Sequence, residues 1–404
     1  MVSAAFVIAV GFGIIAPIIP QFAESFGVSA AAAGAVVSVF AFSRLVCAPP
    51  VGKLIDAIGS RHIYMTGLIT VGTATALIAI TTAYWQMFAL RFIAGIGSTM
   101  FTISAMGLVV RLAPREIRGK ASSAYATAFL LGNIVGPVLG AALAALGMRI
   151  PFVIYGACVW AATAIVWRKM PKSIGRPHAT AGGAIMTVRQ AWRDSAFRCA
   201  VVSGFANGWS NFGVRVAVLP LFAASVFHHG GSIAGLALAA FALGNAAALQ
   251  VSGRLSDRIG RRPLILLGLA VNGGFTAALG FASGFWPLMI TSAIAGVGGG
   301  LLNPPQQAAL ADIIGNERSG GGVLSAFQMA QDCGTISGPI VVGAIATRLG
   351  FAWAFSACGV VAAVAFVVWM FGRETLPTKA GARSRSFRGF RGRKPAPGGA
   401  DAGA

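Results

Sequence analysis

Apolar residues occur in long continuous blocks along this chain, and short polar segments separate the blocks. A helix of roughly 20 apolar residues crosses the hydrocarbon core of a bilayer, so each block predicts one transmembrane helix. The blocks predict twelve spans, at residues 3–23, 31–51, 63–82, 86–110, 121–146, 150–167, 199–222, 232–252, 264–283, 286–310, 322–346 and 351–371. The pattern therefore predicts an all-α membrane protein.

Two polar segments set the domain organisation. Residues 168–198 are polar and rich in Arg, Lys, Pro and Gly, and they are interpreted as a cytoplasmic linker between six-helix bundles at residues 1–167 and 199–372. Residues 373–404 interleave basic residues with Gly, Ser and Pro, a composition that cannot bury enough apolar area to fold. We expect a disordered basic tail, which either attracts anionic lipid headgroups or stays solvated as a topology signal.

Basic residues concentrate in alternate loops. One set of connections, near residues 53–61, 111–120, 168–198 and 254–262, is rich in Arg and Lys, whereas the other set holds little more than Arg149 and Arg348. Short basic loops face the cytoplasm. The chain is therefore expected to be a multi-pass protein of the inner (plasma) membrane, with both termini cytoplasmic.

Composition excludes several classes of protein. The chain is 56% hydrophobic and only 10% charged, with a mean hydropathy of +0.79, whereas a soluble domain carries roughly a quarter of its residues as charges. The net charge of +21 does not indicate nucleic acid, because the basic residues lie between apolar blocks and form no stripe on a soluble fold. The five cysteines show no metal or disulfide spacing.

The two halves of the chain repeat one another. The segment GKLIDAIGSR begins at Gly52, and GRLSDRIGRR begins 201 positions later at Gly253. The pair Gly136 and Pro137 likewise matches Gly338 and Pro339. Parallel repeats of six spans are related by an axis along the membrane normal and can rock around a central site. The repeat therefore predicts alternating access between two bundles.

These residues resemble the major facilitator superfamily, and the resemblance covers residues 1–372. The loop after the second span is similar to the superfamily's Gly-x-x-x-Asp-x-x-Gly-Arg/Lys-Arg/Lys region, with Ser60 in place of the usual base. The resemblance implies a latch in which glycines allow close approach, the acid meets a helix N-terminus and the bases bind carboxylates or headgroups; the alternative is a topology signal alone. The two copies comprise Gly52, Asp56, Gly59, Arg61, Gly253, Asp257, Gly260 and Arg261.

Two further motifs of the superfamily occur in the first half. Arg91, followed by Gly95 and Gly97, resembles an Arg-x-x-x-Gly-x-Gly motif, for which we weigh proton coupling or conformational switching against a structural pairing. A segment in the fifth span is similar to the antiporter motif of twelve-span drug:proton exchangers, and it favours export, although the Gly338 copy shows that such a kink can be structural. The antiporter residues are Gly132, Gly136, Pro137 and Gly140.

Asp332 is the only carboxylate deep within a predicted span. Spans two and eleven are neighbours in the superfamily, and Arg44 lies about 12 Å from the end of its span at about 1.5 Å per residue, a depth comparable with that of Asp332. We hypothesise that they form an ion pair in one access state. A nearby guanidinium favours the charged form of the carboxylate, and separation of the two groups favours the protonated form, which would link protonation to rocking of the bundles. The alternative is a static ion pair that fixes packing.

The leading interpretation is proton-coupled efflux of amphipathic small molecules or drugs. The alternatives are uptake or facilitated passage of a specific metabolite, with an anion favoured because buried arginines outnumber buried acids, and a sensor or scaffold that transports nothing. Arg215 is expected either to attract an anionic substrate or to pair with Glu24. The other residues expected around a substrate cavity are Gln21, Phe40, Phe42, Phe101, Trp209, Phe212, Phe241 and Asn245.

No nucleophile elbow, phosphate loop or metal-ligand cluster stands out, so the chain is not expected to be an enzyme. No metal or other cofactor is expected, and the proton gradient is the predicted energy source. The expected partners are a small-molecule substrate, protons and the lipid bilayer, with no nucleic acid. The chain is expected to act as a monomer.

Overall fold

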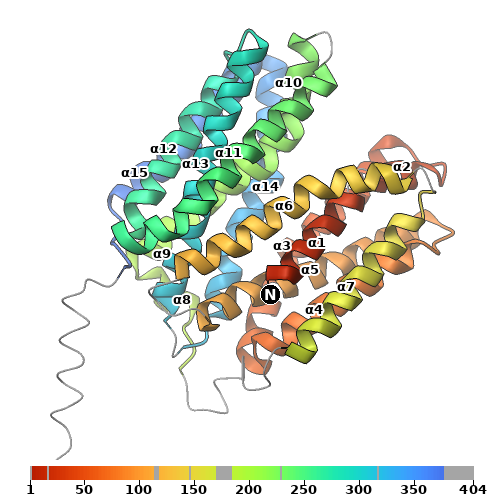
Figure 1. The fold of residues 1–404 in the computed structure, drawn as a ribbon, viewed down its shortest axis with the longest axis horizontal. Coiled ribbons are helices and arrows are strands. Elements are labelled where there is room, and N and C mark those ends of the chain that lie inside the picture. The colour runs from red at the N-terminus through yellow and green to blue at the C-terminus, as the bar shows by residue number, and fades with distance from the viewer. Residues whose placement is uncertain are drawn as a thin grey trace, which may run out of the picture.

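The computed structural model describes residues 2–15, 18–112, 118–144, 147–169, 184–227, 230–315 and 318–376 (Figure 1). These residues fold into helices, and the described part of the chain contains no strand beyond a single β-bridge between Ile185 and Ser319. The all-α prediction is therefore confirmed for the described residues.

The described residues of the first bundle form six spans. The first span consists of two helices, α1 and α2, separated by residues outside the described part, and each of the others is one continuous helix. The helices are α1 (Val2–Ile15), α2 (Ile18–Glu24), α3 (Ala30–Ile58), α4 (Ser60–Ile78), α5 (Tyr84–Leu112), α6 (Arg118–Ala144) and α7 (Ile150–Lys169).

The second bundle repeats this order after the short helix α8 (Val188–Trp192). Its first span includes a π-helical stretch, in which each backbone hydrogen bond joins residues five apart. The elements are α9 (Ser195–Asn207), η3 (Gly208–Val214), α10 (Arg215–Val226), α11 (Gly230–Ile259), α12 (Arg261–Leu279), α13 (Phe285–Ile314), α14 (Gly321–Leu349) and α15 (Phe351–Met370). Several helices run beyond their predicted spans, and α11 continues through Ile259.

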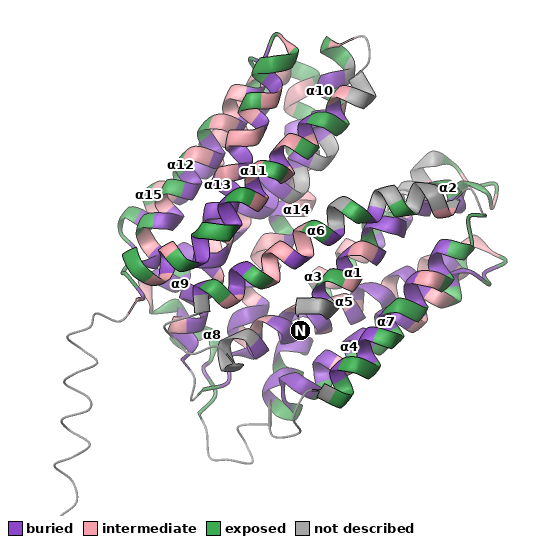
Figure 2. Ribbon diagram, viewed as in Figure 1, coloured by how far each residue is buried: buried purple, intermediate pink, exposed green. Residues whose placement is uncertain are grey.

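Buried and exposed positions both occur along the helices (Figure 2), and apolar residues are found at both. Leu68, Phe152 and Phe355 are almost fully buried, whereas Trp160 and Leu243 are largely exposed. Seven of the described helices are long and apolar enough to cross a membrane. A helix that is apolar all round fits a lipid environment, where no polar outer face is needed.

In each bundle, a glycine allows the fifth span to pack closely on the first. A Cβ at Gly136 would lie 2.5 Å from the Val10 carbonyl oxygen of α1, and one at Gly334 would lie 2.2 Å from the Phe205 carbonyl oxygen of α9. Such distances exclude any side chain, so these glycines set the packing of α6 on α1 and of α14 on α9. The antiporter-like segment thus has a structural role in this fold.

The two bundles meet mainly through α3 with α14 and through α6 with α11. Their helices converge near α8 and α9 and diverge toward α2 and α10 (Figure 1). We call the converging end, formed by residues 52–61 and 253–262, the latch end.

Candidate functional site

Asp56 joins the first bundle to the second at the latch end. Its Oδ1 atom accepts hydrogen bonds from the Gly321 N–H at 2.8 Å and from Ser319 Oγ at 2.5 Å, and its Oδ2 atom accepts one from the Gly322 N–H at 3.3 Å. The carboxylate therefore satisfies the N-terminus of α14, where the helix dipole favours negative charge. Gly59, with φ of 97°, makes the left-handed turn that follows Asp56's helix.

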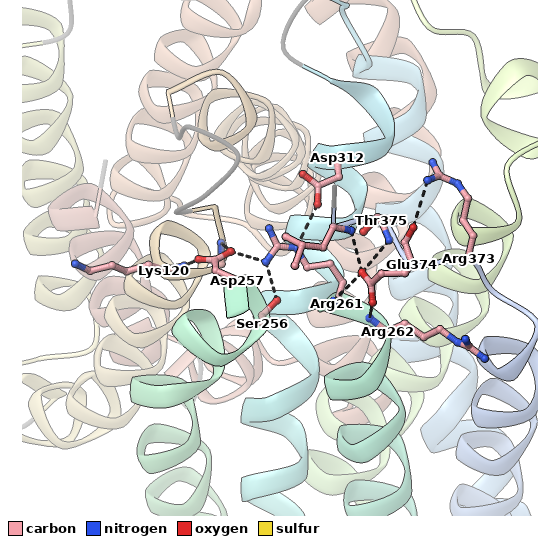
Figure 3. A network of polar contacts seen from close by, with 11 residues as sticks. Lys120, Ser256, Asp257, Arg261, Arg262, Asp312, Arg373, Glu374 and Thr375 are labelled. Atoms are coloured by element: carbon pink, nitrogen blue, oxygen red, sulfur yellow. Dashed lines mark hydrogen bonds and ion pairs between the residues drawn. The ribbon is translucent and has the colours of Figure 1, made fainter. Parts of the chain in front are cut away.

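Asp257 makes the equivalent contact in the opposite direction (Figure 3). Its two oxygens accept hydrogen bonds from the Gly119 and Lys120 N–H groups of α6 at 3.0 and 3.1 Å. The helices can approach this closely because Gly253 has no Cβ, which would lie 2.3 Å from the Gly119 carbonyl oxygen. A Cβ on Gly52 would likewise lie 2.8 Å from the Gly321 carbonyl oxygen. Two reciprocal carboxylate caps thus hold the latch end together.

The two latches differ in their basic residues. Arg261 forms ion pairs with Asp257 and with Asp312, the latter at 3.2 Å, and it also donates to Ser256 Oγ at 3.1 Å. The first-bundle counterpart of Arg261, 201 positions earlier, is Ser60, which carries no charge. The adjacent Arg61 is buried, and its Nε atom has no hydrogen-bond partner among the described residues. Only the second latch is therefore supported by an ion-pair network in the described part of the chain.

The segment after α15 closes over the second latch. Glu374 accepts hydrogen bonds from the Arg261 and Arg262 N–H groups at 2.9 and 3.0 Å, which caps the N-terminus of α12. Arg373 binds Asp194, the N-cap of α9, with its Nε atom 2.8 Å from Oδ1. Residues 373–376, assigned above to a disordered tail, are therefore ordered onto the latch end, which corrects that boundary; residues 377–404 lie outside the described part.

The linker also reaches the latch. The Met186 N–H donates to the Ser319 carbonyl oxygen at 2.8 Å, and the Ser319 N–H donates to the Ala184 carbonyl oxygen at 3.2 Å. The hydroxyl of the same serine donates to Asp56. The end of the predicted linker is therefore hydrogen-bonded to Ser319, which is itself one of the donors to Asp56.

Arg44 and Asp332 meet across the bundles at greater depth. The Arg44 Nη2 atom lies 3.2 Å from Asp332 Oδ1, which also accepts a hydrogen bond from Gln328 Nε2 at 2.9 Å. Arg44 Nη1 donates to Ser98 Oγ at 2.7 Å. Asp332 Oδ2 is buried and has no hydrogen-bond partner among the described residues. The predicted juxtaposition is therefore present, with an acceptor atom left unused.

Two buried arginines lie over equivalent phenylalanines. The Arg91 guanidinium is 4.3 Å from the centre of the Phe40 ring, and that of Arg215 is 4.0 Å from the Phe241 ring. The two phenylalanines are 201 positions apart, whereas the arginines come from α5 and α10. Both arginines are 2% exposed, so each bundle encloses a cation against an aromatic face.

Arg215 does not form the predicted alternative pair with Glu24. Its Nη2 atom donates to Thr276 Oγ1 of α12 at 2.7 Å, inside the second bundle, while Glu24 is exposed at the end of α2. The helix places the guanidinium toward α11 and α12, which directs it away from the first bundle.

A chain of amides in the second bundle was not identified from the sequence. Asn211 Nδ2 donates to Asn207 Oδ1, whose own amide donates to Asn303 Oδ1, each at 2.8 Å. Asn272 Nδ2 donates to Asn211 Oδ1 at 3.0 Å. Asn207, Asn211 and Arg215 recur every four residues, and this spacing was the available sequence signal for one polar helix face.

Several residues expected around a cavity lie elsewhere. Phe101 packs against Tyr64 in the core of the first bundle, and Trp209 packs against Phe205 in the core of the second, so both are corrected to core residues. Gln21 and Phe42 are exposed. Asn245, in contrast, is buried beside Gly299 within the second bundle and stays a candidate. The surroundings of Phe212, and of Pro137 and Gly140 in the antiporter-like segment, lie outside what the structure describes.

Comparisons with known proteins agree with this architecture. The sequence profile of the Major Facilitator Superfamily matches residues 1–230 and 200–397. The tetracycline resistance protein, class C, of Escherichia coli is 26% identical over 85% of this chain and 89% of that protein. The multidrug resistance protein MdtG of Yersinia enterocolitica is 25% identical over 88% of each chain.

A solved structure supports the fold. The E. coli fucose:proton symporter FucP superposes with a TM-score of 0.76, 17% sequence identity, and coverage of 92% of this chain and 97% of that one. Together with the profile match, this similarity confirms the predicted twelve-helix fold of two bundles.

Proposed function

The chain belongs to the Major Facilitator Superfamily, and we propose that this membrane transporter exports amphipathic small molecules in exchange for protons. It is a transporter and not an enzyme. The relatives named above are resistance proteins, for tetracycline in one case and for multiple drugs in the other. Their names and the antiporter-like segment at Gly132 and Gly136 support the direction of transport.

Transport proceeds by alternating access. The carboxylates of Asp56 and Asp257 each cap a helix of the opposite bundle, so opening the latch end requires both caps to break. The positive-inside pattern supports a cytoplasmic latch end, with both termini on that side of the inner membrane. The structure then corresponds to a state closed to the cytoplasm. The transporter functions as a monomer with no bound cofactor.

The ion pair between Arg44 and Asp332 is the observation that carries the proton-coupling proposal. The pair spans the two bundles, so rocking separates the guanidinium from the carboxylate. An isolated carboxylate in an apolar environment is costly, and uptake of a proton removes its charge. Protonation of Asp332 therefore favours the separated state, and deprotonation favours the paired state.

Ethidium accumulation in cells tests the export function. Cells that express the protein are expected to hold less ethidium than vector controls, and a protonophore is expected to abolish the difference. Equal ethidium levels with and without the protein, across a panel of cationic dyes, would contradict export. Lower levels that persist in the protonophore would support export without proton coupling.

Passage of an anionic metabolite is the second candidate. Its support is Arg215, a buried cation with no carboxylate partner among the described residues. The direction of flux separates the two candidates, because uptake would raise the cellular concentration of the substrate. Proteoliposomes that show no flux of any tested compound would instead favour a sensor or scaffold.

A further inference from the structure

Three groups of the second bundle converge on Gly299 of α13. A Cβ built on this glycine would lie 3.3 Å from Asn245 Nδ2, 3.4 Å from Phe241 Cζ and 3.5 Å from Asn211 Nδ2. A Cβ would therefore be in contact with an aromatic ring and two amides, so the glycine lets α13 lie close against these three groups. Each group comes from a different turn of α11 or η3, so the helices place them together.

Arg215 adds an unneutralised charge to this cluster. Its guanidinium lies 4.0 Å from the centre of the Phe241 ring, and its Nη2 atom is held by Thr276. Nε and Nη1 are buried, and neither has a hydrogen-bond partner among the described residues. Buried charged donors are normally paired, because leaving them without acceptors is costly.

A purely structural brace does not account for this geometry. A brace between α10 and α12 needs only the single hydrogen bond to Thr276, and a neutral donor such as a glutamine amide makes such a bond without burying a charge. Two unused N–H groups on a 2% exposed arginine indicate that acceptors arrive from elsewhere. The π-helical turn η3 ends directly before Arg215, and such turns are frequent at functional sites.

We propose that Arg215, Phe241 and Asn245 form a subsite for the anionic group of an aromatic substrate. The guanidinium donates to an oxygen of the anionic group through Nη1, Asn245 adds a hydrogen bond, and the Phe241 ring provides the apolar wall. The inference rests on the proposed transport function, and it extends that function to amphipathic anions. The cluster is nearly closed in this structure, so the subsite opens through a rearrangement of α10, α11 and α13 within the second bundle.

A matched pair of fluorescent probes tests the subsite. Anthracene-9-carboxylate and anthracene-9-carboxamide share ring and shape and differ in charge. Fluorescence anisotropy with the purified full-length protein measures both dissociation constants. The wild-type protein is expected to prefer the carboxylate, and Arg215→Gln is expected to weaken carboxylate binding roughly 10- to 100-fold, the size of a lost charged hydrogen bond. Carboxamide binding should change by less than about twofold on the same scale.

Two further variants separate recognition from support of the fold. Thr276→Val removes the hydrogen bond to Arg215 and keeps its charge, so the preference for the carboxylate should persist. Arg215→Lys keeps the charge and loses the planar guanidinium, so it should weaken binding of the carboxylate alone, and by less than Arg215→Gln does. Arg215→Lys also provides the test if Arg215→Gln does not fold.

Equal weakening of both probes in the Arg215 variants would overturn the subsite and assign the arginine to packing. Equal affinity of the wild type for the two probes would overturn it as well. Failure of the transport function would have a different signature, because ethidium export would be absent while the Arg215-dependent carboxylate preference remained. Intact ethidium export with no such preference would overturn the subsite alone.

Discussion

Arg44 and Asp332 are 288 positions apart in the chain, yet the Nη2 atom of the arginine lies 3.2 Å from Oδ1 of the aspartate. The pair lies deeper than the latch carboxylates, in the region where α3 and α14 still pack together. One side chain belongs to each bundle. Rocking of one bundle against the other that opens the latch end must therefore separate these two charges.

The first prediction concerns the coupling energy of this pair. Arg44→Ala leaves a carboxylate without its cation and is expected to lower the unfolding temperature more than the double variant Arg44→Ala with Asp332→Asn. The coupling should be roughly 0.5–3 kcal/mol, the range for residues in contact. Thermal unfolding of the two single variants and the double variant measures it. Additive effects would show that the two residues do not interact.

The second prediction concerns the close approach at the latch end. Gly253→Val places methyl groups where the Gly119 carbonyl oxygen lies, 2.3 Å from an ideal Cβ. The variant should therefore shift the population toward the open latch. Spin labels on Lys120→Cys and Arg254→Cys, both at exposed positions, should report a longer mean distance. Gly235→Val is the matched control on the same helix, because nothing lies within 4 Å of its Cβ; an equal shift in the control would contradict the prediction.

The third prediction concerns the Asp56 cap. Asp56→Ala removes the acceptor for three donors at the N-terminus of α14 and should cost about 0.5–2 kcal/mol of stability, the usual range for a lost N-cap. Asp56→Asn retains an acceptor oxygen and should recover most of that loss. Thermal unfolding compares the two variants. If Asn and Ala were equally destabilising, the carboxylate would act through its charge and not as a cap.

The fourth prediction concerns pH. Burial raises the pKa of Asp194, but hydrogen bonds from Arg373 and the Ala196 N–H and the attraction of Arg373 and Arg198 outweigh it, so the pKa is lowered overall. The same pairing raises the pKa of Arg373. The stabilisation is therefore present above the unfolded-state value of about 3.9 and is lost as the pH falls through the lower folded-state pKa.

Asp194→Asn tests this dependence, because asparagine keeps the N-cap of α9 and removes the ion pair. Arg373 is half-exposed, so the loss should stay below about 1 kcal/mol. It should be constant from about pH 8 to pH 5 and should shrink below about pH 4. A difference between the two proteins that grows on acidification would contradict the assignment.

The sequence predicted the helices well because a membrane span is a local property of hydropathy. The latch positions were also predictable, since a repeated motif with charged residues between apolar blocks is visible in one chain. The pairing of Arg44 with Asp332 required a further step, namely which spans are neighbours, and the family resemblance supplied it.

Other features depend on side-chain packing between distant helices. One example is the pair of contacts that Arg91 makes with Phe40 and Arg215 makes with Phe241. The two phenylalanines occupy equivalent positions of the repeat, but the two arginines do not, so an alignment of the halves does not reveal that the contacts are similar. Phe101 could not be distinguished from a cavity residue, because core and cavity aromatics look alike in an apolar helix. The hydrogen bonds of Glu374 were missed because a basic, polar composition dominates the tail that follows it.

Ethidium transport in proteoliposomes with an imposed pH gradient tests the central claim most directly. The wild-type protein is expected to move ethidium against its gradient, toward the side with more protons and in proportion to the pH difference. Asp332→Asn, which cannot exchange a proton, should retain only downhill exchange that is independent of the pH gradient. Unchanged dependence on the pH gradient in Asp332→Asn would contradict the assignment of proton coupling to the Arg44–Asp332 pair.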